Sequence, residues 1–208
     1  MRLYLSSMGV GDHPDRLVEV LGSGASVGVV LNAVDDRPDD ETQMAWEVER
    51  DELEHLGLLP ERLDLRSDTD VERLRTVDAL WVRGGNTFVL RAAMARSGAD
   101  DVIIRRILDS SLAYAGYSAG AAILCADLTL ISEIDDPRAA GTDPLMTGLG
   151  ILDRPLIPHV GTTAFEEGRL CTALHERLTA AGIAHHALRD GDALATVAGR
   201  LLPTPRRH

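Results

Sequence analysis

A serine between glycines is the first feature of this chain that could carry chemistry. Ser118 lies in the stretch GYSAG, residues 116–120, after the strand-like run 111–117 and before a run of small residues. A sharp strand-to-helix turn exposes a reactive hydroxyl, and it needs glycines because a Cβ two positions away on either side would collide with the crowded backbone. The pattern therefore predicts a nucleophile at Ser118, with an ordinary turn as the alternative.

A serine nucleophile needs a general base, and His159 is the histidine best placed to supply it. It ends the apolar run 154–159, and Pro158 stiffens the backbone before it. The carboxyl end of a strand in a parallel sheet is where ligands bind. A loop histidine that caps a turn is the alternative reading.

The base in turn needs a carboxylate that orients it. The candidates between the serine and the histidine are Glu133, Asp135, Asp136 and Asp143. The order serine, acid, histidine is that of the α/β-hydrolases, whose acid lies much farther along the chain. The spacing therefore argues against that fold.

Two backbone amides, those of Gly85 and Ala119, are candidates for an oxyanion hole. Gly85 lies in RGGNT, residues 83–87, where two glycines after an expected strand let an N–H group approach the site closely. Asn86 can cap the following helix. A plain strand-to-helix turn is the alternative here.

Apolar strands and charged helical stretches alternate along most of the chain. Strands are expected at 2–7, 26–33, 61–65, 78–85 and 111–117. Helical spacing occupies 39–56, 86–96 and 99–109. This alternation predicts an α/β fold, with a mostly parallel sheet and helices on both faces.

The last third of the chain is less regular. A long loop of a functional type is expected over 132–150, then a short strand at 154–160 and a helix at 163–181. The final short strands, expected as an antiparallel margin, are 183–188, 193–199 and 200–203, before a frayed tail at 203–208. We expect one domain spanning 1–208.

Composition excludes several classes of function. The net charge of −12 and the pI near 4.9 argue against nucleic acid and anionic membranes as partners. All 21 basic residues are Arg, so no lysine can act in catalysis. Cys125 and Cys171 form no Cys-x-x-Cys pair, and no signal peptide or membrane span is evident, so we expect a cytoplasmic protein without a structural zinc site.

Three motifs in order carry a family resemblance. Gly-Gly-Asn-Thr, Gly-Tyr-Ser-Ala-Gly-Ala and, about forty residues later, Pro-His together resemble the peptidase E (aspartyl dipeptidase) family of serine peptidases. The resemblance covers most of the chain and implies a fold like that of class I glutamine amidotransferases. It further implies hydrolysis of dipeptides and short peptides with an N-terminal aspartate, by a monomer or homodimer, without a metal or other cofactor.

The resemblance also implies roles for individual residues. Ser118 matches the nucleophile, His159 the base, and Gly85 with Ala119 the oxyanion donors. The family's acid lies about fifteen residues after the serine, which here is Glu133.

We rank Glu133 above Asp135 because the run LTLISE, residues 128–133, is expected to be a strand that holds Glu133 in a fixed position at its end. Asn32 matches a polar strand-end position and, with Asn86, is expected to bind substrate.

Two departures from the family pattern affect substrate specificity. Arg83 replaces the first glycine of the usual Gly-Gly-Gly-Asn. The stretch after Pro-His lacks the family's His-x-Gly-Glu-Thr-Arg, whose arginine is thought to hold the substrate's aspartate. Arg83 and Arg169 are the candidates to replace that arginine.

Two other functions remain open. Cyanophycinase shares the fold and hydrolyses β-aspartyl-arginine dipeptides, although its first motif more often reads Gly-Gly-Asp-Gln. The other alternative is a relative that binds a ligand and has lost turnover.

Overall fold

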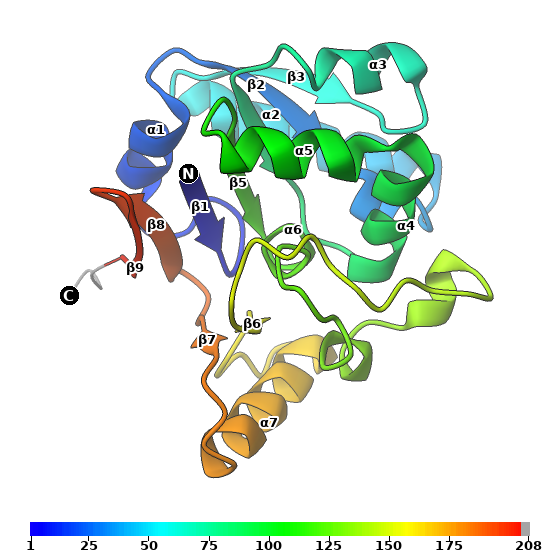
Figure 1. Cartoon of the computed structure of the whole chain (residues 1–208), viewed down its shortest axis with the longest axis vertical. Coiled ribbons are helices and arrows are strands. Elements are labelled where there is room, and N and C mark those ends of the chain that lie inside the picture. The colour runs from blue at the N-terminus through cyan, green and yellow to red at the C-terminus, as the bar shows by residue number, and fades with distance from the viewer. Residues whose placement is uncertain (205–208) are drawn as a thin grey trace.

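The computed structural model describes residues 1–204, and a seven-stranded sheet forms its centre (Figure 1). The strand order is β3-β2-β4-β5-β1-β8-β9, in which β3 to β1 are parallel and β8 and β9 are antiparallel. The strands are β1 (Arg2–Ser6), β2 (Ser26–Val30), β3 (Leu59–Leu63), β4 (Ala79–Val82), β5 (Ala113–Tyr117), β8 (Ala193–Val197) and β9 (Arg200–Pro203). The expected α/β fold is confirmed.

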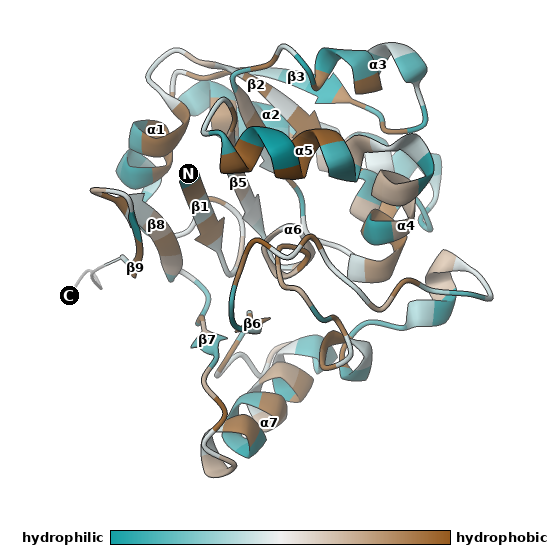
Figure 2. Cartoon of the chain, in the orientation of Figure 1, coloured by the Kyte–Doolittle hydropathy of each residue, from teal (hydrophilic) through white to brown (hydrophobic). Residues whose placement is uncertain are grey.

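Helices cover both faces of the sheet. They are α1 (Pro14–Leu21), α2 (Asp39–His55), α3 (Asp68–Arg73), α4 (Thr87–Ser97), α5 (Ala99–Leu108), α6 (Ala119–Ala122) and α7 (Glu166–Ala180). Apolar residues of α1 and α2 share one buried cluster, and those of α4 to α7 share another. Figure 2 shows the amphipathic pattern of α5, with one brown side and one teal side.

The strand sequences explain why both faces are covered. Every residue of β4 is buried, as is every residue of β5. Leu80 and Val82 belong to one apolar cluster, while Ala79 and Trp81 belong to the other. Side chains alternate across a strand, so an uninterrupted apolar run requires packing on both sides of the sheet.

The structure departs from the sequence expectations mainly in short elements. Helices α1 and α3 were not anticipated. The expected strand at 128–133 is absent, and its end forms the 3-10 helix η2 (Ile131–Glu133). Thr204 is held by hydrogen bonds to Ala193, so fraying does not begin at 203, and residues 205–208 of the expected tail lie outside the described residues.

A second, two-stranded sheet lies below the main sheet in Figure 1. It pairs β6 (Leu156–Ile157) with β7 (His186–Ala187) in parallel. Helix α7 connects these strands, so two distant stretches of chain run side by side. No helix in residues 1–204 combines the length and apolar character needed to cross a membrane.

Candidate active site

The turn between β5 and α6 presents Ser118 in a strained conformation. Its φ of 49° lies in the left-handed region, which residues with a Cβ rarely adopt. The flanking glycines make the turn possible, because a Cβ on Gly116 would strike the Gly120 carbonyl and one on Gly120 would strike the Val82 carbonyl. The local geometry is that of a nucleophile elbow.

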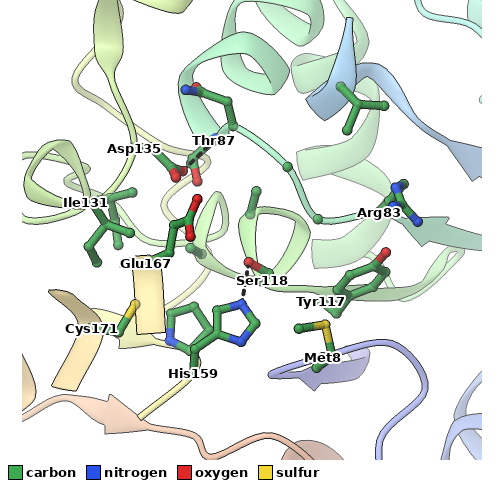
Figure 3. A pocket seen from close by; sticks show the side chains of 18 of the residues that line it. Met8, Arg83, Thr87, Tyr117, Ser118, Ile131, Asp135, His159, Glu167 and Cys171 are labelled. Atoms are coloured by element: carbon green, nitrogen blue, oxygen red, sulfur yellow. Dashed lines mark hydrogen bonds between the residues drawn. The ribbon is translucent and has the colours of Figure 1, made fainter. Parts of the chain in front are cut away.

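His159 contacts both the serine and a carboxylate. Its Nε2 lies 3.0 Å from Ser118 Oγ, and its Nδ1 lies 2.7 Å from Asp190 Oδ1. Figure 3 shows the ring of His159 directly beside Ser118. The arrangement of hydroxyl, imidazole and carboxylate is that of a serine triad.

Asp190 is held by several donors besides the imidazole. Thr162 Oγ1 donates to it at 2.6 Å and Ser7 Oγ at 2.9 Å. Burial would raise the pKa of the Asp190 carboxyl, but the hydrogen bonds from Thr162, His159 and Ser7 outweigh burial and hold the pKa below its usual value. The carboxylate therefore stays ionised at neutral pH.

Ser7, directly after β1, joins the base and the acid. Its hydroxyl accepts a hydrogen bond from the backbone N–H of His159 at 2.7 Å and donates one to Asp190. One side-chain oxygen at the end of a central strand thus fixes the positions of both groups.

The register of β6 with β7 brings His159 and Asp190 together. Leu156 pairs with His186 and Ile157 with Ala187, so the residues that follow the two strands emerge at the same edge. His159 follows β6 with a φ of 56°, and Asp190 follows β7. Parallel strands place their carboxyl ends together, and this small sheet does so outside the main one.

The expected pairing of Glu133 with His159 does not occur. Glu133 is exposed, and Arg177 of α7 donates to both of its carboxylate oxygens, at 2.6 and 2.7 Å. The hydrogen bonds from Arg177 lower the pKa of Glu133. The expectation failed because residues 131–133 form a 3-10 turn at the surface rather than a strand that leads to the site.

Asp135, the second choice for the acid, lies in the site without contacting the imidazole nitrogen. Its Oδ2 accepts a hydrogen bond from the backbone N–H of Thr87 at 2.8 Å. It lines the same cavity as Ser118. Asp190 was overlooked because it lies beyond His159, although the polar turn 189–192 after an expected strand was a usable signal.

The two expected oxyanion donors lie on the cavity beside Ser118. Gly85 has a φ of 150°, and a Cβ there would collide with the Ala33 carbonyl. Among the described residues, neither the Gly85 nor the Ala119 N–H group donates to a backbone or side-chain acceptor. Both amides are therefore available to an oxygen bound at the serine.

The two asparagines differ in their positions. Asn86 lines the cavity and caps α4, its Oδ1 accepting from the amides of Phe88 and Val89 while its Nδ2 donates to the Asp136 carbonyl. Asn32 is 2% exposed and is not a cavity residue.

The amide of Asn32 instead bonds Asp35, Asp64 and the Leu65 N–H group, so it organises the turn after β2. Its expected contact with substrate is corrected accordingly.

The two candidate arginines are also engaged elsewhere. Arg83 lines the cavity but forms an ion pair with Glu49, a residue of α2 that is 2% exposed. The same carboxylate accepts from Trp81 Nε1 at 2.6 Å and from the Tyr117 hydroxyl at 2.7 Å. Arg169 lies outside the cavity and donates to the Thr163 carbonyl at 2.9 Å.

The cavity around Ser118 encloses about 390 Å³. Met8 and Phe165 are among its apolar walls, and the Phe165 ring meets the His159 ring edge-on at 5.3 Å. Ser118 and His159, which line the cavity, together with Asp190 behind the imidazole and the two free amides, are the groups that acyl transfer requires.

Comparison with known proteins places this site in a family. The model of peptidase family S51 matches residues 39–201. The chain belongs to peptidase family S51. The expected membership of the peptidase E group is thereby confirmed.

Curated relatives are similar over about half of the chain. An uncharacterized peptidase of Listeria monocytogenes is 37% identical over 118 residues, 55% of this chain and 57% of the relative. An uncharacterized peptidase of Pasteurella multocida is 29% identical over 114 residues, 53% of this chain and 55% of the relative. The aligned stretch thus spans little more than half the length of these relatives.

Solved structures extend the similarity in fold to the whole chain. A Listeria monocytogenes protein provisionally named peptidase E has a TM-score of 0.80 at 24% identity, covering 99% of this chain and 98% of that one. A peptidase from an acI-B1 actinobacterium has a TM-score of 0.68 at 16% identity, covering 94% and 82%.

Proposed function

We propose that this S51 chain is a serine peptidase that hydrolyses dipeptides or short peptides. The observation that carries the proposal is the chain of contacts from Ser118 Oγ through His159 to Asp190, at 3.0 and 2.7 Å. A hydroxyl becomes nucleophilic when an adjacent imidazole removes its proton, and the carboxylate holds that imidazole in the required tautomer.

The proposed reaction is acyl transfer in two steps. His159 takes the proton of Ser118 as the oxygen attacks the peptide carbonyl, and the Gly85 and Ala119 amides stabilise the oxyanion. The imidazolium then gives its proton to the leaving amine as the peptide bond breaks. Water, deprotonated by His159, attacks the acyl-enzyme and releases the acid.

A preference for N-terminal aspartate would depend on the arginines of the cavity. Binding an aspartate side chain in the cavity would need an arginine free to pair with it. Arg83 is paired with Glu49 and Arg169 lies outside the cavity, but Arg37 lines the cavity and has no ion pair among residues 1–204. The rates on Asp-X and neutral dipeptides therefore test whether Arg37 binds an acidic side chain of the substrate.

Substitution of the triad tests the function. Ser118→Ala should reduce kcat on the best substrate of a panel of neutral, Asp-X and β-aspartyl-arginine dipeptides by about 10⁴-fold or more, because the nucleophile is lost. A serine-directed phosphonate should add one equivalent to the wild-type chain and none to the variant, measured by intact-protein mass spectrometry. Unchanged turnover in the variant would refute the proposal.

A matched pair of substitutions tests the choice of acid. Asp190→Asn should reduce kcat by about 10³- to 10⁴-fold, because the imidazole loses the acceptor that sets its tautomer. Glu133→Gln removes only the surface ion pair with Arg177 and should leave kcat within about twofold of wild type. A large loss of kcat in Glu133→Gln with little change in Asp190→Asn would instead identify Glu133 as the acid.

A further inference from the structure

The two ends of the catalytic cavity differ in charge. Figure 3 shows Arg83 on one side of Ser118, and Asp135 with Glu167 on the other. At the first end, Glu49 balances the arginine from within the fold. The second end has two carboxylates from different elements, one after η2 and one in the first turn of α7.

No basic side chain of the described residues pairs with the two carboxylates at the acidic end. Asp135 accepts a hydrogen bond from the Thr87 N–H group, which is uncharged, and Glu167 has no ion pair or side-chain hydrogen bond in residues 1–204. The imidazole of His159 is already bonded to Ser118 and Asp190.

Both carboxylates act on their surroundings as uncompensated charges. Burial raises the pKa of Asp135 against the hydrogen bond from Thr87, and the charge of Glu167 raises it further. Burial first, and then the charges of Asp135, Glu167 and Asp190, raise the pKa of the Cys171 thiol to about 12. Cys171 also lines the cavity, and the raised pKa keeps its thiol protonated at neutral pH.

On the basis of the serine peptidase function proposed above, we propose that Asp135 and Glu167 bind a cationic nitrogen of the peptide substrate. Every free short peptide carries such a group as its α-ammonium, and an arginine or lysine side chain carries the same chemistry. The acidic pair does not stand alone, because it shares one cavity with the Ser118–His159 pair and faces it.

The charge and enclosure of this end suit an ammonium group. An ammonium has three N–H donors and no acceptor, and a carboxylate has only acceptors. Charge-assisted hydrogen bonds are strong, and a partly enclosed cavity screens them less than bulk water does. The cavity that would hold the α-ammonium also contains Ser118, so we expect the first peptide bond to be the one that Ser118 attacks.

Binding to the Ser118→Ala variant tests this inference without depending on turnover. Calorimetric titration should show that alanyl-alanine binds at least tenfold more tightly than N-acetyl-alanyl-alanine. Arginyl-alanine and N-acetyl-arginyl-alanine distinguish the two sources of charge. If the side chain is the bound cation, acetylation will not weaken the arginyl peptide; if the α-ammonium is bound, acetylation will weaken both peptides.

A second substitution assigns the effect to the acidic pair. In the Ser118→Ala background, Glu167→Gln should weaken binding of the preferred cationic peptide about tenfold and leave neutral N-acetyl-alanyl-alanine unchanged. Glu166→Gln, in the same exposed first turn of α7 but outside the cavity, is the matched control and should change neither. Asp135→Asn should act like Glu167→Gln.

The outcomes separate this inference from the proposed function. Equal affinity for charged and acetylated peptides, with no gain for arginine, would overturn the cation site even if wild-type Ser118 reacts with the phosphonate. Equal losses in the Glu166 and Glu167 variants would also overturn it. If the wild-type chain is not labelled by the phosphonate but the Ser118→Ala variant still binds cationic peptides through Glu167, the peptidase mechanism is refuted and the cation site stands.

Discussion

The two ends of the cavity use carboxylates in opposite ways. Glu49 is buried and receives hydrogen bonds from Trp81, Tyr117 and Arg83, so its charge is satisfied inside the fold. Asp135 is also largely withdrawn from water, but it receives one backbone N–H and faces another acid. A carboxylate with its counter-charge in the chain contributes to structure, whereas one without it has capacity left for a ligand.

Glu49→Gln should produce the largest effect on stability. Removal of the negative charge leaves Arg83, whose side chain is 22% exposed, without a counter-charge. Breaking a buried ion pair from one side costs about 3 to 5 kcal/mol, and urea unfolding should show a loss of this size. Glu47→Gln, on the exposed side of the same helix, should change the free energy of unfolding by less than about 0.5 kcal/mol.

Tyr117→Phe should have the next largest effect. The substitution removes the hydroxyl that donates to Glu49 at 2.7 Å and keeps the ring. Hydrogen bonds to charged groups contribute about 1.5 to 3 kcal/mol, so the free energy of unfolding should fall by that amount. An unchanged midpoint in urea would mean that Glu49 is satisfied without this donor, and the contrast between the two ends would weaken.

Asp135→Asn should have the opposite sign. The pKa of Asp135 is raised by burial and by Glu167, so the charged form destabilises the native state at neutral pH. Asparagine removes that charge and keeps an acceptor for Thr87, so the variant should be more stable than wild type by about 1 kcal/mol at pH 8. The gain should shrink as pH falls below the raised pKa of Asp135 in the native state, because the wild-type carboxyl is then protonated; a gain independent of pH would contradict this explanation.

Glu167→Gln should have the smallest effect on stability. Its side chain is exposed and has no ion pair in residues 1–204. The free energy of unfolding, measured by thermal denaturation, should therefore change by less than about 0.5 kcal/mol. A large loss would indicate that Glu167 supports the fold and is not free for a ligand.

Much of the architecture could be predicted because buried parallel strands leave a strong pattern. The runs at 78–85 and 111–117 contain the fully buried stretches 79–82 and 113–117, and both of these stretches form central strands. The glycines around Ser118 also pointed to the turn correctly, since backbone crowding there excludes any Cβ. These features depend on local sequence, which is why they could be read directly.

The acid could not be chosen from local sequence. Asp190 meets His159 only because β6 and β7 pair, and each of these strands is two residues long. Such short strands carry almost no periodic signal, and the pairing joins segments about thirty residues apart. Glu133 matched the family spacing, but one 3-10 turn directs it to Arg177 at the surface.

The ion-pair partner of Arg83 could not be predicted from local sequence either. Its place after a strand suggested a free cation at the site, and the sequence contains no local sign of its partner. Glu49 lies on a helix 34 residues earlier and reaches Arg83 only after α2 packs against the sheet.

The hydrogen bonds of Ser7 have a consequence for the order in which the molecule matures. The serine elbow is built from residues in the first 120 positions, but the imidazole and the carboxylate are tied to β1 through one hydroxyl contributed by the seventh residue. A nascent chain therefore carries its hydroxyl long before that hydroxyl can be deprotonated. If the proposed triad carries the reaction, hydrolytic activity will arise only after synthesis has passed residue 190 and the late segment has docked onto the earliest strand.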